Sequence, residues 1–183
     1  QLTQGRPVTD IAEQALSGGA IAIQLRVAPG DIETAERVHE LCAATGALFV
    51  VEDRADIAAA TKADGVRLPE NGLPLDAARR VLTPWQIVGT STSTSAEARA
   101  SIAAGADYVA MDIADGFDAL RTVGMHASRG GPPLIAYRGI TTKNVSEVAN
   151  AGADGFCVTT AVTESPNPQM AAEMLIAAFR QGI

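Results

Sequence analysis

Aromatic side chains are scarce in this chain, at 4% of 183 residues, although hydrophobic residues make up 47%. Alanine dominates the apolar set, and a core of this kind favours closely packed helices over an aromatic-rich β-sandwich. Cysteine is rarer still: Cys42 and Cys157 lie far apart and match neither a metal-binding nor a redox spacing. Both thiols are therefore expected to be small buried hydrophobic groups.

A surplus of positive charge is also missing. The formal net charge is −7, and no run of lysine and arginine offsets it. This balance argues against a nucleic-acid-binding protein. A few arginines in one pocket can still reverse the local sign of the potential, so anionic small molecules remain candidate ligands.

Long apolar runs are absent as well. No stretch is long and apolar enough to span a membrane, and no signal peptide is visible. We therefore expect no membrane partner and a cytoplasmic location. The chain begins at Gln1 instead of a methionine, so we expect an upstream segment to have been trimmed or to belong to another domain.

Short β-type runs alternate with alanine-rich helical stretches along the whole chain. Strands are predicted at 20–27, 47–53, 65–68, 86–92, 108–113, 134–137 and 155–160, with a stub at 2–4 as the first of eight. Helices are predicted at 31–44, 54–62, 75–82, 95–104, 142–151 and 168–181. This alternation predicts a parallel sheet with right-handed crossovers, as one (β/α)₈ TIM-barrel domain over residues 1–183. A doubly wound open sheet is the alternative, but no glycine-rich dinucleotide turn follows the first predicted strand.

One short pattern recurs at the junctions between helices and strands. Gly-Gly-Ala at 18–20, Ala-Asp-Gly at 63–65, Gly-Ala-Asp at 105–107 and Gly-Ala-Asp-Gly at 152–155 each close a helix and lead into a strand. Glycine supplies the left-handed conformation that ends a helix. The repeat length of roughly forty-five residues matches two βα units and does not indicate a solenoid.

Polar side chains gather where the predicted strands end, which is where a barrel of this kind carries its active site. The strand at 20–27 places Gln24 and Arg26 on a face shared only with Ala22 and Ala28, and we expect this face to point into the barrel near its mouth. A ligand, or a carboxylate such as Asp53, would satisfy these polar groups. Other strands end in Glu52-Asp53-Arg54, Arg67, Thr90–Ser95, Asp112 and Asp115, Tyr137-Arg138-Gly139 and Thr159-Thr160.

The last two strand ends form the usual phosphate pocket of this architecture. Gly139 lets the backbone approach an anion, Arg138 can supply a bidentate contact, and Thr159 and Thr160 add hydroxyls. The alternative is an ordinary turn with a solvated arginine. Two interpretations also stay open for Asp53, which could bind Mg²⁺ or cap the helix predicted at 54–62.

The serine- and threonine-rich run at 90–95 resembles a nucleophile-bearing loop, but it has no histidine nearby. His39 and His126 both fall in or beside predicted helices, so a Ser-His-Asp triad is not expected. Ser95 is expected to cap the following helix, with no Glu at the third helical position to complete a capping box.

Five segments resemble, in order and spacing, the thiamin phosphate synthase family, which includes the thiazole tautomerases. They read "GGAIAIQLR", "FVVEDRADIAAATKADGVRL", "IVGTSTS", "GADYVAM" and "GADGFCVTTAV", and together they cover nearly the whole chain. The resemblance implies a barrel that joins an aminopyrimidine diphosphate to a thiazole phosphate, with Mg²⁺ neutralising the departing pyrophosphate. A small phosphorylated heterocycle is then the expected ligand.

The resemblance carries several site residues over. Gln24 would contact the pyrimidine, Arg26 and Ser91 would take part in catalysis, and Asp53 would be the surviving metal ligand. Arg67 stands where the family has histidine. The family's Gly-Gly-Ile phosphate turn reads Arg138-Gly139-Ile140.

Other family residues are missing. The family's lysine after the Gln-x-Arg pair is Ala28, its asparagine before the metal-binding aspartate is Glu52, and its second metal-binding aspartate is Gly72. The histidine of the tautomerase-like loop is Ser93, and the lysine-bearing loop after the strand at 108–113 has no counterpart. Mg²⁺ binding is therefore weakened.

Each lost charge contact is worth about 2–4 kcal/mol by analogy with the loss of single transition-state donors. Arg67 and Arg138 restore some positive charge in different places. Two functions follow: a divergent enzyme of thiamin biosynthesis or salvage, or a catalytically inactive paralogue that binds phosphorylated ligands or regulates. A homodimer or a fused upstream domain is the expected protein partner.

Overall fold

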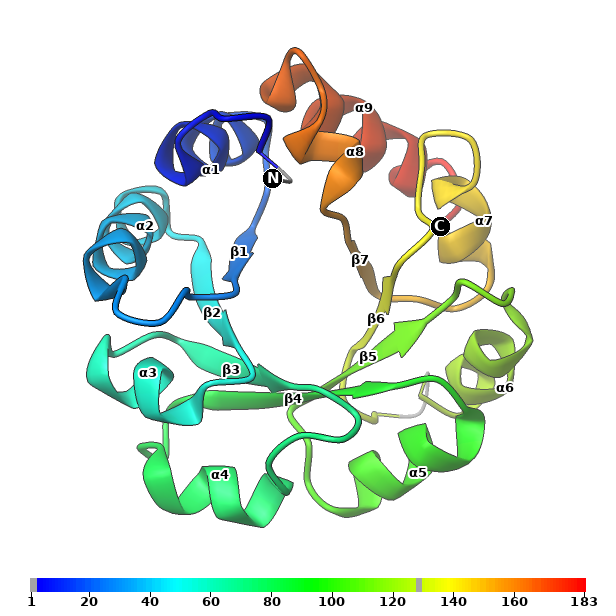
Figure 1. Ribbon diagram of the computed structural model, residues 1–183. Helices are drawn as coiled ribbons and strands as arrows, with labels where there is room; N and C mark the ends of the chain where they lie inside the picture. The colour runs from blue at the N-terminus through cyan, green and yellow to red at the C-terminus, as the bar shows by residue number, and fades with distance from the viewer. Residues whose placement is uncertain (1–2, 128–129) are drawn as a thin grey trace.

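Seven parallel strands form one curled sheet with helices on its outer side (Figure 1). The computed structural model describes residues 3–127 and 130–183. The strands follow each other around the sheet in sequence order, and each is parallel to the next. They are β1 (Ala22–Leu25), β2 (Leu48–Glu52), β3 (Gly65–Leu68), β4 (Ile87–Thr92), β5 (Tyr108–Asp112), β6 (Leu134–Tyr137) and β7 (Gly155–Cys157).

The parallel α/β prediction is therefore confirmed, and the sequential strand order excludes a doubly wound sheet with its reversal point. The predicted eighth strand is not found in the part of the chain that the structure describes. Leu2 lies outside the described residues, and residues 3–5 form a turn. β1 and β7 are thus the two edges of the sheet, and they face each other across the ring in Figure 1.

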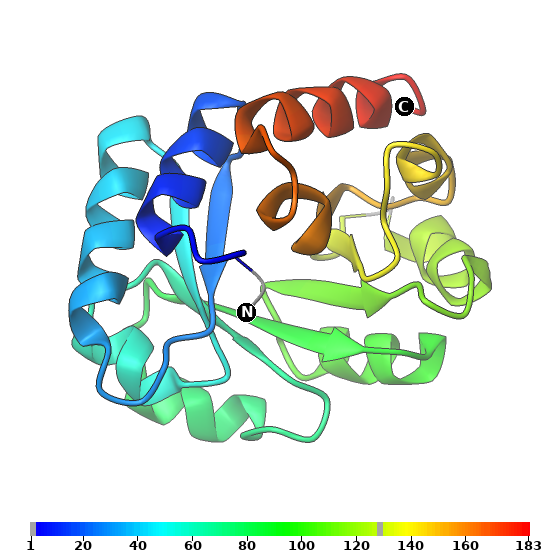
Figure 2. The ribbon, with the colours of Figure 1, turned by 45° about the horizontal axis from the view of Figure 1, so that its top comes forward.

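The helices lie around the outside of the sheet, except for one short helix near the end of β7 (Figure 1). They are α1 (Val8–Ser17), α2 (Ile32–Thr45), α3 (Ala55–Ala60), α4 (Leu75–Val81), α5 (Ser95–Ala103), α6 (Asp118–Ala127), α7 (Val145–Asn150), α8 (Thr160–Thr163) and α9 (Pro168–Arg180). The short helix is α8, which packs against α9 and α1. Near the two sheet edges, α1 packs against α9 (Figure 2), and Arg6 Nη2 donates to the Thr163 carbonyl at 2.6 Å. Within the described residues, no helix has the length and apolarity to cross a membrane.

The two faces of the sheet carry different side chains. Phe49, Val51, Val66, Val88 and Met111 point outward and are fully buried under the helices. Strand alternation then turns a second set inward. The register pairs Glu52 with Arg67, Arg67 with Gly89, and Gly89 with Tyr108, so these positions line one level of the barrel interior.

Gly89 makes room for the aromatic ring of Tyr108 inside the barrel. A Cβ atom at position 89 would lie 2.0 Å from the Tyr108 ring, far closer than any real contact. Burial raises the pKa of the Tyr108 phenol, so the ring stays neutral. One small and one large residue on neighbouring strands therefore fill this level together.

The two cysteines differ from the prediction in part. Cys42 is fully buried on α2, and burial raises the pKa of its thiol to about 11. Cys157 is only half-buried at the end of β7. Burial raises its pKa too, and the charge of Arg67 opposes this shift. The register pairs Cys157 with Tyr137 of β6.

Three aspartates of the recurring pattern, Asp64, Asp107 and Asp154, each form two hydrogen bonds to the start of the neighbouring strand. Asp64 donates its amide to the Phe49 carbonyl at 2.9 Å and accepts the Phe49 amide on Oδ2 at 2.7 Å. Asp107 does the same to Val88, at 2.9 and 2.6 Å, and Asp154 does so to Leu134, at 2.9 and 2.8 Å. The sequence repeat is thus a repeated two-bond clamp at the amino ends of the strands.

The glycines of this repeat fulfil the predicted role at three of the four junctions. Gly19, Gly105 and Gly152 have φ values of 93°, 86° and 95°, the left-handed conformation expected after a helix. At the second junction, Lys62 takes that conformation with φ 53°, and Gly65 starts β3 instead. A Cβ at Gly65 would lie 2.3 Å from the Ile87 carbonyl oxygen, so glycine there serves close strand packing.

Candidate functional site

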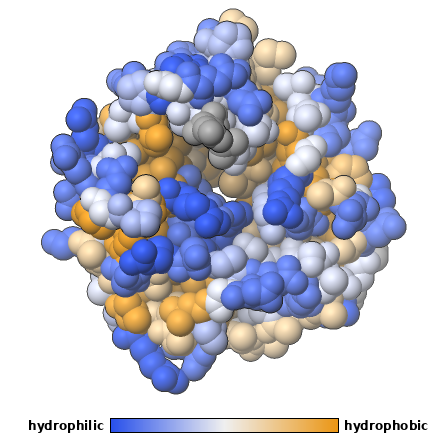
Figure 3. All heavy atoms as spheres, in the orientation of Figure 1, coloured by the Kyte–Doolittle hydropathy of each residue, from blue (hydrophilic) through white to orange (hydrophobic). Residues whose placement is uncertain are grey.

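The carboxyl ends of the strands bring most of the predicted polar residues to one end of the sheet. Figure 3 shows hydrophilic side chains gathered around a hollow at the centre of the ring. We call this end the mouth and define it by the residues that end or follow β1 to β7, namely Gln24, Arg26, Glu52, Arg67, Ser91, Asp112, Tyr137, Arg138, Gly139, Thr159 and Thr160.

Three charged residues form the centre of the mouth. Arg26 Nη2 donates to Glu52 Oε1 at 2.8 Å, and Arg67 Nη2 donates to the same oxygen at 3.1 Å. The exposed fractions of the three side chains are 67% for Arg26, 19% for Glu52 and 10% for Arg67. A carboxylate does satisfy Arg26, as expected, but that carboxylate belongs to Glu52 and not to Asp53.

The two guanidinium groups keep Glu52 ionised. Burial alone would raise the pKa of this carboxyl group. The hydrogen bond from Arg26 and the charges of Arg67 and Arg26 outweigh that effect and hold the pKa below its usual range. Two cationic groups against one carboxylate leave the Arg26–Glu52–Arg67 trio with one net positive charge.

Arg67 is held on its other side by an aromatic ring. Its guanidinium carbon lies 4.7 Å from the centroid of the Tyr137 ring, a cation–π contact. Its Nε and Nη1 atoms are buried and have no hydrogen-bond partner among the described residues. Burial raises the pKa of Tyr137, and a hydrogen bond with Ser91 opposes the shift, so Ser91 also contacts this cluster.

Asp53 follows directly after β2 and leaves the strand. It has φ 71°, and its amide donates to the Arg67 carbonyl at 2.8 Å. Helix α3 has Arg54 as its N-terminal cap, with no side-chain capping bond, so the interpretation of Asp53 as a helix cap is wrong. Arg54 instead pairs with Asp56, at 2.8 and 2.5 Å.

The residues at the mouth do not fit a Mg²⁺ centre. Glu52 is engaged by two arginines, and Gly72 offers no carboxylate where the resemblance would place a second one. Across residues 3–127 and 130–183, no group of three or more histidine, cysteine, aspartate and glutamate side chains is placed to hold a metal. Metal binding by Asp53 stays a prediction without a second ligand to support it.

The predicted phosphate pocket combines the ends of β6 and β7. Arg138 and Gly139 have φ values of 64° and 65°, so this turn is left-handed at two successive residues. Arg138 Nη1 donates to Asp112 Oδ2 at 2.7 Å, and its side chain is otherwise 68% exposed. Since β6 pairs Tyr137 with Cys157 of β7, the exposed Thr159 and Thr160 follow the neighbouring strand end.

The serine- and threonine-rich run contains the helix cap one residue earlier than predicted. Thr94, and not Ser95, caps α5: its hydroxyl accepts the Glu97 amide at 3.2 Å, and Glu97 Oε2 accepts the Thr94 amide at 2.9 Å. Counting from Thr94 puts Glu97 at the third helical position, so a full capping box is present. His39, on α2, stacks on the ring of Phe49 of β2.

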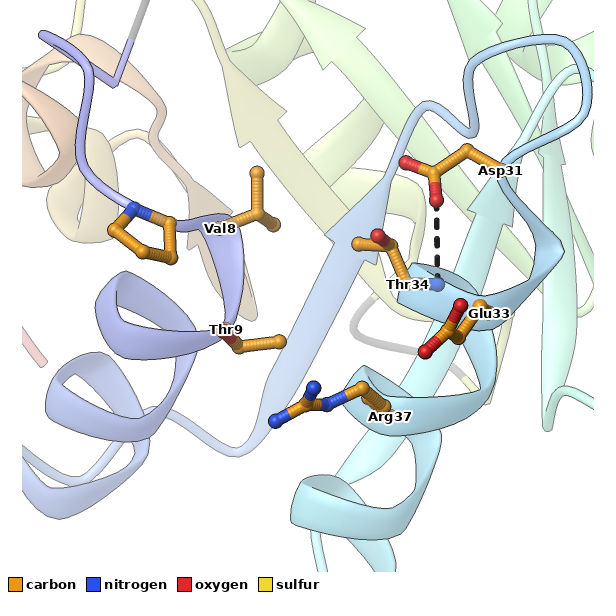
Figure 4. A pocket seen from close by; sticks show the side chains of 7 residues that line it. Val8, Thr9, Asp31, Glu33, Thr34 and Arg37 are labelled. Atoms are coloured by element: carbon orange, nitrogen blue, oxygen red, sulfur yellow. Dashed lines mark hydrogen bonds between the residues drawn. The ribbon is translucent and has the colours of Figure 1, made fainter.

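Two surface hollows lie outside the centre of the mouth. One, of about 330 Å³, lies between the starts of α1 and α2, and Figure 4 shows Arg37 and Glu33 beside it, with Asp31 bonded to the Thr34 amide at 3.3 Å. The other, of about 120 Å³, is lined by Ser93, Asp112, Asp115, Gly116, Asp118 and Ala119. Its acidic lining makes it a poor receptor for phosphate.

Sequence reasoning missed the central role of Glu52 and the stacking role of Tyr137. Glu52 and Asp53 are adjacent, and the sequence alone does not say which of them still belongs to the strand. The run Leu48–Val51 is apolar at every position, so it contains no alternation that would decide between the two residues. The pairing of Glu52 with Arg67 across two strands follows only from the register.

Comparison with known proteins agrees with this geometry. The family model described as thiamine monophosphate synthase matches residues 1–162. The thiamine-phosphate synthase of Chlorobium luteolum is 40% identical over 92% of this chain and 85% of its own length. That of Methanoculleus marisnigri is 40% identical over 94% of this chain and 88% of its own length.

Solved structures give the same result. The thiamine phosphate pyrophosphorylase of Pyrococcus furiosus superposes with a TM-score of 0.89 at 31% identity, covering 98% of this chain and 93% of that one. The orotidine 5′-phosphate decarboxylase of Pyrococcus horikoshii, with a TM-score of 0.72 at 15% identity over 97% of this chain and 95% of that one, shares the fold alone. From its match to the family model and its identity with these relatives over most of their length, this chain belongs to the thiamine monophosphate synthase family.

Proposed function

We propose that this protein acts in thiamine biosynthesis or salvage as a thiamine-phosphate synthase that binds phosphorylated heterocycles at the mouth of the barrel. The main support for this proposal is that the chain is 36–40% identical to thiamine-phosphate synthases over nearly its whole length. The charge at the mouth supports the same proposal, because three arginines lie at one end of a protein whose net charge is −7.

The proposed roles of the mouth residues follow from their places. Gln24 on β1 contacts the pyrimidine, while Arg26 and Arg67 contact the diphosphate that leaves. Arg138 and Gly139, together with the hydroxyls of Thr159 and Thr160, contact the thiazole phosphate, since they follow neighbouring strand ends.

The reaction forms a carbon–nitrogen bond between the two heterocycles and breaks the carbon–oxygen bond to the diphosphate. Negative charge then accumulates on the departing pyrophosphate. Fixed positive groups stabilise such a charge most when they are already in position. Arg26 and Arg67 are positioned by Glu52, and Ser91 is held beside Tyr137 and Arg67, where its hydroxyl can contact the reacting groups.

A coupled assay tests this proposal. The protein is mixed with aminopyrimidine diphosphate and thiazole phosphate, and thiamine phosphate and pyrophosphate are measured by chromatography. We expect both products in equal amounts, and a loss of turnover in Arg26→Gln. No product at high protein concentration, with or without Mg²⁺, would show that the chain is not a synthase.

A second function is favoured by one observation, namely the use of Glu52 as an ion-pair partner together with the missing lysine at Ala28. In this case the chain is a paralogue that binds phosphorylated ligands without turning them over. Calorimetric titration with thiazole phosphate separates the two functions. Saturable binding without product formation supports the paralogue, whereas no heat with either substrate contradicts it.

We also propose a cytoplasmic location, because phosphorylated heterocycles are charged and do not cross membranes unaided. A homodimer stays a prediction that light scattering on the purified protein tests. A fused partner domain has a precedent among the relatives. The thiamine biosynthesis bifunctional protein ThiM/ThiE of Symbiobacterium thermophilum is 37% identical over 98% of this chain, which spans 40% of that protein.

A further inference from the structure

We infer that the mouth binds its anionic ligand without a divalent cation, with Glu52 acting as the internal counter-ion of Arg26 and Arg67 and not as a metal ligand. This inference rests on the proposed function, since it concerns the same phosphorylated ligands. Glu52 stands where the resembling family has asparagine, and its Oε1 atom is the acceptor that both arginines share.

That oxygen has no room for a metal. Glu52 Oε1 accepts hydrogen bonds from Arg26 at 2.8 Å and from Arg67 at 3.1 Å. Mg²⁺ requires ligand oxygens at about 2.0–2.1 Å in near-octahedral order. A cation at that distance from Oε1 would lie beside two guanidinium groups, and their repulsion works against it.

The neighbouring carboxylates, Asp53 and Asp112, do not supply the missing metal ligands. Asp53 turns away from β2 at φ 71°, and the described part of the chain brings no group of three potential metal ligands together. Asp112 is engaged by Arg138 at 2.7 Å and by the Ala114 amide at 2.9 Å. Each of the carboxylates Glu52 and Asp112 is thus already paired with arginine.

Arg67 points to the kind of ligand that fits instead. Its side chain is 10% exposed, and its buried Nε and Nη1 atoms have no hydrogen-bond acceptor in the described residues. Buried guanidinium donors are costly to leave unpaired. An oxyanion supplies the acceptors they lack, and Arg26, with 67% of its side chain exposed, is the group that such an anion meets first.

The metal-ligand role and the counter-ion role predict opposite effects of one substitution. In Glu52→Gln a counter-ion is removed, so two arginines are freed and the anion binds more tightly. We expect inorganic pyrophosphate, titrated by calorimetry in EDTA, to bind the wild type and to bind Glu52→Gln on the order of fivefold to tenfold more tightly. If Glu52 were a metal ligand, the opposite would hold: pyrophosphate would bind neither to the wild type in EDTA nor to Glu52→Gln.

Three controls make the experiment decisive. Asp56→Asn breaks an arginine–carboxylate pair with Arg54 that involves none of the residues that define the mouth, and it should leave the affinity unchanged. Arg26→Gln should lose at least tenfold in affinity, and circular dichroism checks the fold of each variant. If Glu52→Gln does not fold, the affinities of the wild type and of Arg26→Gln for pyrophosphate in EDTA still show whether the anion binds without a metal.

The outcomes separate this inference from the proposed function. Pyrophosphate binding that appears only with added Mg²⁺, together with manganese(II) bound by paramagnetic resonance, overturns the inference and leaves the synthase proposal standing. Binding in EDTA without turnover supports the inference and counts against the synthase. No binding in either buffer contradicts both.

Discussion

At the level of single residues, the adjacent carboxylates Glu52 and Asp53 differ because only Glu52 still belongs to β2. β2 ends at Glu52, so that side chain still follows the strand alternation and points between Arg26 and Arg67. Asp53 adopts a left-handed backbone at φ 71° and leaves the sheet. The carboxylate that the mouth uses is therefore the residue that differs from the family pattern.

The ion pairs of Glu52 predict a pH dependence of stability. Its pKa is lower in the folded protein than in the unfolded chain, so the unfolded chain binds more protons as the solution is acidified. The stabilisation is present above the unfolded pKa and is lost as the pH falls through the folded pKa. Urea unfolding from about pH 5 downward should therefore cost the wild type more stability than Glu52→Gln. Parallel curves for the two proteins would contradict this.

The Gly89–Tyr108 pair predicts a coupled effect on stability. Gly89→Ala places a Cβ 2.0 Å from the Tyr108 ring, and we expect it to lower the free energy of unfolding by about 1–3 kcal/mol through overpacking. In the background of Tyr108→Ala the clash is gone, so the same substitution should cost much less. Urea denaturation of all four proteins measures the coupling. Equal costs in both backgrounds would show that the ring does not limit position 89.

At the scale of elements, the aspartates of the repeat fasten each strand start to its neighbour. A clamp of two hydrogen bonds fixes the register at Phe49, Val88 and Leu134. Because a parallel sheet has no hairpins to set its register, such fixed points align the strands from the amino ends. The polar residues at the carboxyl ends are aligned as a consequence.

Asp107→Ala tests the clamp. The variant leaves the Val88 amide without its side-chain acceptor and removes the carboxylate that pairs with Arg79 at 2.5 Å. We expect a loss of about 1–3 kcal/mol in the free energy of unfolding. Asp76→Ala, which breaks an exposed pair with Arg80, should cost less than about 1 kcal/mol. If both substitutions cost the same in chemical denaturation, the clamp contributes nothing beyond a surface ion pair.

The start of α5 gives a second test at this scale. Thr94→Ala removes the capping hydroxyl and should lower the free energy of unfolding by about 0.5–2 kcal/mol. Ser95→Ala, one residue later, should change it little, because Ser95 is the first helical residue and not the cap. Thermal unfolding of the two variants compares them directly. A larger effect at Ser95 would restore the assignment made from the sequence.

At the scale of the whole molecule, the curled sheet separates two environments. Its outer face is an apolar layer under helices, and its inner face carries charge toward one end. The fold was predictable from the sequence because alternating βα units and glycine-ended helices are local signals. The eighth strand is not found among the described residues, and the sequence could not test it, because a three-residue stub at 2–4 has no periodicity to measure.

The position of the predicted site residues could be read from the sequence, but their partners could not. Strand ends are local signals, so Arg26, Arg67, Ser91 and Arg138 were expected at the mouth, and their roles there stay predictions. Their partners could not be, since the pairings Arg26–Glu52 and Arg138–Asp112 each join residues 26 positions apart through the register and curl of the sheet. The choice between metal ligand and counter-ion depends on those partners.

We propose that phosphorylated heterocycles bind at the arginine-lined mouth without a metal ion, and a crystal structure with thiamine phosphate in EDTA tests both points at once. We predict the phosphate within hydrogen-bond distance of the Arg26 guanidinium or of the turn at Arg138 and Gly139, with no metal bound. Ligand density in the hollow between α1 and α2 instead would contradict binding at the mouth, and density that appears only after Mg²⁺ is added and is bridged by Asp53 would contradict binding without a metal.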